Sequence, residues 1–238
     1  MKSVKYQLLK FVGINLIRSF EFFISIIQKS TVFFKSDEFY FLKEIESKWE
    51  LIRDEYININ ASQDIASIQT FFEEMSIITE NENWKSFMIK LYGQNLISNQ
   101  KKCPVTSDLV NKCPEITAAM FSVLSPGKKI LPHRGPYKGI LRYHLGLIIP
   151  DDFSSCKIIV NGEEKNWEEG KGFVFDDTFT HEAINNSTMS RVILFIDFIR
   201  PLPFPVNKIN KLIVKLIAQS PFVQETVKKA EMQQLINE

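Results

Sequence analysis

Short β-rich runs between about residue 84 and residue 199 limit most strongly the folds open to this chain. Each run is rich in β-branched or aromatic residues and ends at a cluster of Gly, Pro, Asn, Asp or Ser, which is typical of a strand followed by a turn. No helical period interrupts them from about residue 120 to 199. Six or more such strands predict an antiparallel sandwich or barrel. The runs are WKSFMIKLYG, AAMFSVLS, GILRYHLGLIIP, CKIIVNG, GKGFVFDD and SRVILFIDFIR.

Helical patterns flank these strands. Apolar residues recur every three or four positions over residues 4–28, which predicts a helix with a broad apolar face. Residues 37–57 and Asp64–Met75 predict two further helices. After the prolines of RPLPFP, the run NKINKLIVKLIAQ predicts a basic amphipathic helix at the other end of the chain. With no internal repeat and no low-complexity linker, we expect one domain with helical ends.

Positive charge is concentrated at the two ends. Residues 1–35 carry a net charge of +5 and residues 200–238 a net charge of +3, whereas residues 36–199 carry −7. Charged residues interrupt the first helix, which falls short of the roughly 18 apolar residues of a membrane span. That helix therefore lies in a membrane interface or packs on the core, and both alternatives stay open. Basic residues confined to amphipathic ends of an acidic body argue against binding of nucleic acid.

The three cysteines are too few and too scattered for a disulfide framework or a structural zinc site. We expect reduced thiols at Cys103, Cys113 and Cys156, with a Cys103–Cys113 bridge as the alternative. The apolar stretch after Lys10 stops at Arg18 and lacks a small-residue cleavage pattern, so it is not a convincing secretory signal. These features favour the cytoplasm of a bacterial-type cell.

The three histidines are candidates for a metal site. His133 follows a predicted strand, and His181 precedes another, so two strands could bring two imidazoles together. Neutral imidazole suits iron, copper or zinc. His144 could serve as a third ligand on sequence grounds, and the plain alternative is that all three histidines fill the core.

Arg142 and Arg191 lie inside otherwise apolar strands. A buried arginine is costly unless it is paired. No acidic residue stands at an obvious matching position on a neighbouring strand, so we expect a carboxylate ligand from solution to pair with them. The histidines and arginines together indicate a metal enzyme that uses an oxo-acid co-substrate.

Three segments between about Trp84 and Pro203 carry a resemblance to a known family, namely MFSVLSPGKKILPHRGPYKGILRYHLGLIIP, NWEEGKGFVFDDTFTHEAIN and RVILFIDFIRPLP. They closely resemble the aspartyl/asparaginyl β-hydroxylase family. The resemblance implies a mainly β fold with flanking helices, built on a double-stranded β-helix (jelly roll). It also implies an iron(II)- and 2-oxoglutarate-dependent dioxygenase that uses O2 to hydroxylate an unactivated C–H bond. We expect four segments along the chain. They are an amphipathic helix in 1–35 that associates with a membrane or packs on the core, a helical support region in 36–83, a jelly-roll dioxygenase domain in 84–203 and a basic amphipathic helical segment in 204–238.

The resemblance assigns roles to single residues. His133 and His181 match the iron ligands of the family. Arg191 matches the arginine that grips the distal carboxylate of 2-oxoglutarate, and Ser122 matches its serine partner. Arg142 and His144 match residues near the metal-facing carboxylate of that co-substrate, which makes His144 a co-substrate contact and not a third ligand.

One departure concerns the carboxylate that most iron and 2-oxoglutarate enzymes place two residues after the first histidine. Gly135 stands there, and members of the resembled family are likewise thought to lack that carboxylate. Asp176 and Asp177 could supply a replacement ligand. We favour the alternative that they shape the turn before His181 and orient it.

The resembled family includes hydroxylases of Asp or Asn side chains and bacterial hydroxylases of lipid A or ornithine lipids. Two basic amphipathic ends suit an enzyme that draws lipid from an anionic cytoplasmic leaflet. We therefore expect a membrane-lipid acyl chain as substrate and a peripheral position on the inner face of the cytoplasmic membrane. Hydroxylation of Asp or Asn in a protein or peptide is the alternative, followed by a non-catalytic jelly-roll binding protein.

Overall fold

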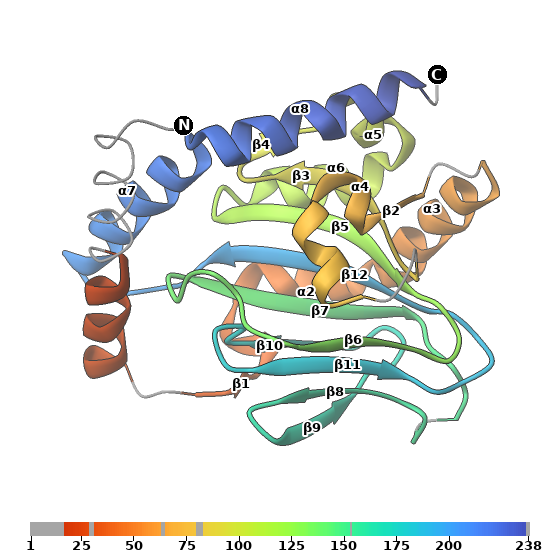
Figure 1. The fold of residues 1–238 in the computed structure, drawn as a ribbon, viewed down its shortest axis with the longest axis horizontal. Helices are drawn as coiled ribbons and strands as arrows, with labels where there is room; N and C mark the ends of the chain where they lie inside the picture. The colour runs from red at the N-terminus through yellow and green to blue at the C-terminus, as the bar shows by residue number, and fades with distance from the viewer. Residues whose placement is uncertain (1–16, 29–30, 63–64, 80–82, 153, 237–238) are drawn as a thin grey trace.

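Two antiparallel β-sheets lie face to face, with helices on the outer face of the larger one (Figure 1). The computed structural model describes the chain except for residues 1–16, 29–30, 63–64, 80–82, 153 and 237–238. Eight strands form the centre, and their order in the two sheets decides the fold. They are β5 (Ile116–Leu124), β6 (Lys128–His133), β7 (Ile140–Ile148), β8 (Cys156–Val160), β9 (Glu163–Asn166), β10 (Gly172–Phe175), β11 (His181–Asn185) and β12 (Arg191–Ile199).

These eight strands form a double-stranded β-helix. The larger sheet contains the order β10-β7-β12-β5, and the smaller sheet has the order β6-β11-β8-β9. The chain therefore changes sheet at each step except between β8 and β9, which form a hairpin in the smaller sheet. The jelly-roll fold implied by the sequence resemblance is confirmed.

Further strands extend the larger sheet at both edges. On one edge β3 pairs with β5, and β2 and β4 pair with β3; on the other, β1 pairs with β10. Their bounds are β1 (Phe33–Phe34), β2 (Ala66–Ser67), β3 (Trp84–Leu91) and β4 (Gln94–Asn95).

Side chains alternate between the two faces of the larger sheet, because successive residues of a strand point to opposite sides. One set packs under the outer helices and includes Tyr143, Leu145 and Leu194. The other set faces the smaller sheet and includes Phe195 and Phe175. The candidate site residues of β5, β7 and β12 belong to this inner face.

The N-terminal helices differ in part from the prediction. The structure places a helix over residues 17–27, and the earlier part of the predicted helix over 4–28 lies outside the described residues. The predicted helix over 37–57 is interrupted at Lys48, because the chain there leaves the helical conformation. The region 64–75 forms only short pieces. The elements are η1 (Ser36–Glu38), α2 (Tyr40–Ser47), α3 (Trp49–Ala61), α4 (Ile68–Phe71) and η2 (Glu73–Ile77).

Two helices between β4 and β5 were not predicted, namely α5 (Ile97–Lys102) and α6 (Pro104–Lys112). The first turn of α6 depends on a residue from α3. The carboxylate of Glu55 accepts hydrogen bonds from the backbone N–H groups of Val105 and Thr106, at 2.6 and 2.9 Å. This cap comes from a distant part of the chain, so no local pattern indicates it.

The C-terminal segment forms two helices, α7 (Val206–Ala218) and α8 (Pro221–Ile236), so the amphipathic helix predicted there is confirmed. α8 runs beside α4 at the edge of the larger sheet (Figure 1). No helix within the described part of the chain has the length and apolar character needed to cross a bilayer. All three cysteines are buried free thiols, in agreement with the expectation of reduced side chains.

Candidate active site

His133 and His181 are direct neighbours in the smaller sheet. His133 ends β6, His181 begins β11, and the strand register pairs the two residues. Their ring centroids lie 4.2 Å apart. The structure thus brings together the two imidazoles that the sequence nominates as iron ligands.

Both imidazoles leave Nε2 available for a metal. His133 Nδ1 lies 2.8 Å from the carbonyl oxygen of Leu131, and His181 Nδ1 lies 3.0 Å from that of Phe179. A carbonyl oxygen only accepts hydrogen bonds, so Nδ1 carries the hydrogen in each ring and Nε2 carries the lone pair. Burial lowers the pKa of both histidines, and the His133 ring adds to the effect on His181, whose pKa falls to about 3. Two neutral imidazoles result.

Arg191 is a buried cation with no anionic partner among the described residues. It is 1% exposed, and its Nε and Nη2 atoms have no hydrogen-bond partner there. Its guanidinium lies over the ring of Trp167, 4.7 Å from the centroid. Burial lowers the pKa of Arg191 to about 10, so the group is still charged at neutral pH. An uncompensated buried charge is costly, and a carboxylate would match the fork of the guanidinium.

His144 adds a neutral donor near Arg191, since Trp167 contacts both residues. Trp167 Nε1 donates to His144 Nδ1 over 3.3 Å. Because Nδ1 accepts, the neutral ring carries its hydrogen on Nε2, which has no acceptor among the described residues. Burial lowers the pKa of His144 well below its ordinary value, and the charge of Arg191 lowers it further. His144 therefore presents an N–H group and no charge.

Ser122 lies on the inner face of β5, diagonally across from Arg191. The register places Ser122 opposite Ile193, two residues along β12 from the arginine. Trp84 Nε1 donates to Ser122 Oγ over 2.9 Å, so the serine hydroxyl hydrogen is still available to an acceptor. The guanidinium, imidazole and hydroxyl together form a buried set of donors suited to an anion.

Arg142 differs from Arg191, because two carboxylates already hold its guanidinium. Its Nε lies 2.8 Å from Asp197 Oδ1, and its Nη2 lies 2.9 Å from Asp177 Oδ2. Burial opposes the charge, but these carboxylates outweigh it and raise the pKa of Arg142. The expectation that Arg142 lacks an acidic partner on a neighbouring strand is wrong, since Asp197 stands opposite it in the register of β7 and β12. Contact between Arg142 and a co-substrate stays a prediction from the sequence resemblance.

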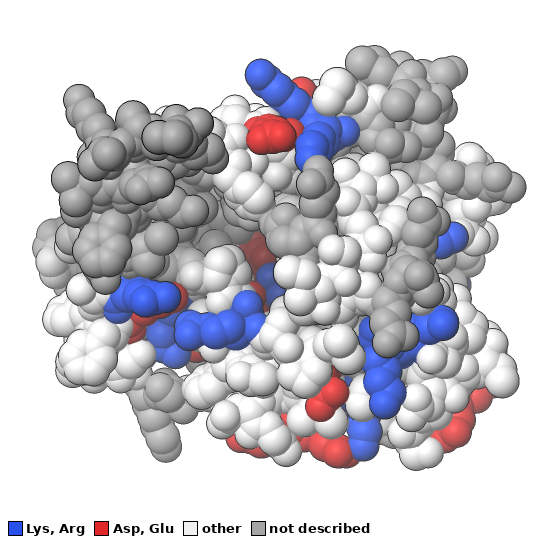
Figure 2. Space-filling model, viewed as in Figure 1, with Lys and Arg blue, Asp and Glu red and all other residues white. Residues whose placement is uncertain are grey.

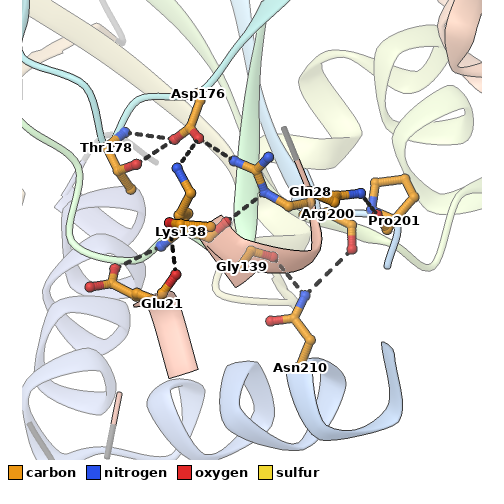
Figure 3. A network of polar contacts seen from close by, with 10 residues as sticks. Glu21, Gln28, Lys138, Gly139, Asp176, Thr178, Arg200, Pro201 and Asn210 are labelled. Carbon is orange, nitrogen blue, oxygen red and sulfur yellow. Dashed lines mark hydrogen bonds and ion pairs between the residues drawn. The ribbon is translucent and has the colours of Figure 1, made fainter. Parts of the chain in front are cut away.

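Asp176 is a structural residue in the turn before His181. Its Oδ2 bonds Lys138 and Arg200, and its Oδ1 accepts from the backbone N–H and the hydroxyl of Thr178 (Figure 3). Burial opposes ionisation of Asp176, but these partners, Arg200 first, lower its pKa. The Thr178 contacts shape the turn, and Lys138 and Arg200 tie the turn to neighbouring segments, which agrees with the alternative that we favoured from the sequence.

Asp177 fills the space beside Gly135. A Cβ atom at Gly135 would overlap the Asp177 carboxylate, and Gly135 N donates to the Asp177 carbonyl oxygen over 2.7 Å. Oδ1 of Asp177 has no partner among the described residues, and burial raises the pKa of this carboxyl to about 7. The position two residues after His133 therefore has no room for a carboxylate side chain.

The residues present fit an iron site with two protein ligands. No group of three His, Cys, Asp or Glu side chains in the described part of the chain is placed to hold one ion. His133 and His181 would bind iron(II) through Nε2, which suits this metal. The remaining positions would then be open to the oxygen atoms of a co-substrate or of water.

A largely apolar cavity of about 370 Å³ adjoins this site. Its polar wall includes His133, Arg142, Asp177 and Asp197. Figure 2 shows this face of the molecule hollowed, with Lys or Arg atoms at the rim and acidic atoms deeper inside. The apolar wall comes from α4, η2, the inner face of the larger sheet and the start of α8. Its side chains include Ile68, Phe72, Met75, Trp84, Met88, Leu91, Met120, Phe195 and Phe222.

Polar contacts fix the loop between β6 and β7 to the terminal helices (Figure 3). Lys138 N donates to Glu21 Oε1 over 2.9 Å, and Arg200 Nε donates to the Lys138 carbonyl oxygen over 2.7 Å. Asn210 of α7 donates through Nδ2 to the carbonyl oxygen of Gly139 over 2.8 Å. The helix over 17–27 and α7 are thereby attached to the loop that follows the first histidine.

Sequence reasoning missed two partners of the predicted residues. Asp197 neutralises Arg142, and Trp84 holds the hydroxyl of Ser122. Asp197 did carry a signal, because an aspartate in the apolar strand SRVILFIDFIR shares the alternate positions of Arg191 and so faces the same side. Trp84 carried none, because its bond to Ser122 depends on how the strands pair.

A family model described as aspartyl/asparaginyl beta-hydroxylase matches residues 46–201. An ornithine lipid ester-linked acyl 2-hydroxylase from Rhizobium tropici is 38% identical over 183 residues, which are 76% of this chain and 65% of that protein. The human aspartyl/asparaginyl beta-hydroxylase is 36% identical over 165 residues, which are 67% of this chain and 21% of that protein. The chain thus spans just under two thirds of the rhizobial protein's length and about a fifth of the human protein's.

Proposed function

The chain belongs to the aspartyl/asparaginyl β-hydroxylase family, and we propose that it is an iron(II)- and 2-oxoglutarate-dependent dioxygenase that hydroxylates an acyl chain of a membrane lipid. The observation that carries the proposal is the unpartnered, buried guanidinium of Arg191, in a fold that also pairs two histidines with free Nε2 atoms. Bound iron would supply the activation of dioxygen, coupled to oxidative decarboxylation of 2-oxoglutarate.

The buried donors would bind the co-substrate. Arg191 pairs with its distal carboxylate through two N–H groups, and the Ser122 hydroxyl donates to the same group. His144 donates from Nε2 toward the metal-facing end of 2-oxoglutarate. Because the pKa of His144 is far below neutral, this donor keeps the same protonation state across the physiological pH range.

These residues also orient the co-substrate and keep water away from it. Trp167 is fully buried and contacts both Arg191 and His144, so it shields both donors from water. The carbonyls of Leu131 and Phe179 hold the two imidazoles in fixed orientations. Fixed partners in a dry pocket reduce the reorganisation that the reaction requires.

The apolar cavity supports an acyl chain as the substrate. Its wall of aliphatic and aromatic side chains suits hydrocarbon, and the cavity reaches His133. The name of the Rhizobium tropici relative states an action on an ester-linked acyl chain, which agrees with this choice. We accordingly place the protein at the inner face of the cytoplasmic membrane as a peripheral protein.

Hydroxylation of an Asp or Asn side chain is the second candidate function. The observation that favours it is the basic part of the cavity wall, where Lys90 and Arg134 could take a carboxylate. The human relative carries the name of that activity. Because the cavity wall is largely apolar, we rank hydroxylation of Asp or Asn below hydroxylation of a lipid acyl chain.

Succinate formation from 2-oxoglutarate separates these candidates. Purified protein with iron(II) and air is assayed with bacterial lipid extract, with Asp- or Asn-containing peptides, and with neither. We expect stimulation by the lipid extract. Stimulation by peptide alone would favour the second candidate over the lipid. No succinate in any of the three assays, together with no binding of iron or 2-oxoglutarate, would contradict the proposal that the protein is an enzyme.

A further inference from the structure

One edge of the molecule exposes large apolar side chains on neighbouring helices. The helix over 17–27 and α7 lie along this edge (Figure 1). Ile24 of the first helix packs with Leu202 and with Val206, the first residue of α7. Phe22 is 70% exposed and Ile26 is 65% exposed. Exposed apolar groups gathered at one edge mark a surface that meets an apolar partner.

α7 carries two parallel stripes on its exposed sides. Ile209, Leu212 and Leu216 are about half exposed and follow one another at spacings of three and four, so they form one line along the helix. Lys208, Lys211 and Lys215 form the adjacent line. The buried side of α7, by contrast, holds Val206 and Asn210. An apolar stripe flanked by lysines is the arrangement of a helix that lies in a membrane interface.

The basic side chains of this edge are largely uncompensated. Lys211 pairs with Glu115 at 3.0 Å, but Lys208 and Lys215 have no acidic partner among the described residues. Arg18 of the neighbouring helix is exposed and likewise has no acidic partner there. This excess of positive charge complements an anionic surface.

The same edge adjoins the apolar cavity. Phe222, at the start of α8, is 52% exposed and also lines the cavity. Arg134 also lines the cavity, and it lines a second hollow as well. The wall of that second hollow includes Ile17 and Arg18 of the helix over 17–27. The cavity that reaches His133 is therefore bordered by the elements that carry the exposed apolar side chains.

We propose that the helix over 17–27, α7 and the start of α8 form a docking face for an anionic lipid bilayer. Apolar side chains of this face enter the interface, the lysines contact acidic headgroups, and an acyl chain passes beside Phe222 into the cavity. The passage of the acyl chain rests on the proposed function, whereas docking itself does not. Hydrogen bonds of Glu21 and Asn210 attach the docking face to the loop that follows His133.

Vesicle binding by the full chain tests the docking face. Vesicles of phosphatidylcholine, with or without about a third of phosphatidylglycerol, are sedimented with the wild type and three variants. The first variant is Ile209→Ser/Leu212→Ser/Leu216→Ser, and the second is Lys208→Gln/Lys215→Gln. The control, Leu51→Ser/Ile57→Ser, alters equally exposed apolar residues of α3. Circular dichroism confirms that each variant is folded.

We expect the wild type and the control to bind the anionic vesicles alike. The α7 apolar variant should lose about tenfold or more in affinity, because three side chains no longer leave water. The lysine variant should lose several-fold at low salt and resemble the wild type at high salt, where charges are screened. Equal binding by all four proteins, or no binding by the wild type, would overturn the docking face.

The failure of this proposal and that of the proposed function are distinguishable, because vesicle binding requires no turnover. A wild type that binds vesicles through α7 but forms no succinate with any lipid contradicts the function and leaves the docking face standing. A wild type that hydroxylates detergent-dispersed lipid but does not bind vesicles contradicts the docking face alone.

Discussion

His133 and His181 face each other across β6 and β11, and each ring is held by a backbone carbonyl two residues earlier in the chain. The shared arrangement follows from the strand register, which pairs the end of one strand with the start of the other. Both rings are oriented by the protein itself. A metal site with only two protein ligands benefits from such support, because fewer bonds to the ion define its geometry.

Replacement of His181 by alanine should abolish turnover and leave the fold intact. The imidazole supplies one of two ligands, so the His181→Ala variant should lose iron(II) binding in a titration and succinate formation in the assay. Its free energy of unfolding should stay within about 2 kcal/mol of the wild type, as for a typical single substitution. Loss of the folded state, or iron binding equal to that of the wild type, would count against the assignment.

Arg191 should determine both co-substrate affinity and stability. Arg191→Lys should raise the 2-oxoglutarate requirement sharply, since lysine cannot form the bidentate pair. Arg191→Met should raise the melting temperature of the free protein, because an uncompensated buried charge is removed. The same variant should show no further rise with 2-oxoglutarate. A shift with 2-oxoglutarate equal to that of the wild type would remove Arg191 from the co-substrate pocket.

Arg200 provides the matched control for that experiment. It is as deeply buried as Arg191, but Asp176 pairs with it. Arg200→Met should therefore lower the melting temperature, because the Asp176 carboxylate loses a partner. Opposite effects of the two Arg→Met substitutions, measured by differential scanning fluorimetry, are the expected result.

Acidification should destabilise the iron-free protein, with a measurable contribution from His144. Burial keeps the pKa of His144 well below 6.5 in the folded state, whereas the unfolded chain takes up a proton near that value. As the pH falls below 6.5, the unfolded state binds more protons and stability declines by up to about 1.4 kcal/mol per pH unit from this residue. Urea unfolding of His144→Leu between pH 7 and 5 should show a shallower decline. Identical slopes in both proteins would contradict this origin.

The neighbouring aspartates should differ in their effect on stability. Asp176→Asn leaves Lys138 and Arg200 buried with less negative charge, so a loss of about 3 to 5 kcal/mol is expected. Asp177→Asn should cost less, because burial already raises the pKa of Asp177 to about 7 and Asp197 still pairs with Arg142. Denaturant titration of both variants at pH 7 measures the order, and an equal loss would contradict these roles.

The β-sheet core could be predicted from sequence because its strands carry a local pattern. Alternating and apolar runs between turn residues identify β5, β7 and β12 without reference to the rest of the chain. The short helices α5 and α6 lack such a pattern, and Glu55 of α3 supplies the first-turn partner of α6. The first turn of α6 therefore depends on a contact between distant segments, which local periodicity does not reveal.

Only part of the candidate site could be predicted from the sequence, for a similar reason. Histidines at strand ends and arginines within apolar strands are visible in the sequence, and the structure brings His133 to His181. The charge balance of the arginines is not visible, because it depends on register. Asp197 stands opposite Arg142, whereas Leu124 stands opposite Arg191, which leaves only the second arginine unpaired.

The most direct test of the proposed function is the fate of dioxygen. Purified protein is incubated with iron(II), 2-oxoglutarate, bacterial membrane lipid and ¹⁸O₂, and the lipids are analysed by fragmentation mass spectrometry. We predict a lipid that gains one labelled oxygen atom on an acyl chain, in an amount equal to the succinate formed, with no product from His181→Ala. Succinate formed without a labelled acyl chain, or a label found on added Asp- or Asn-containing peptide instead, would contradict lipid hydroxylation.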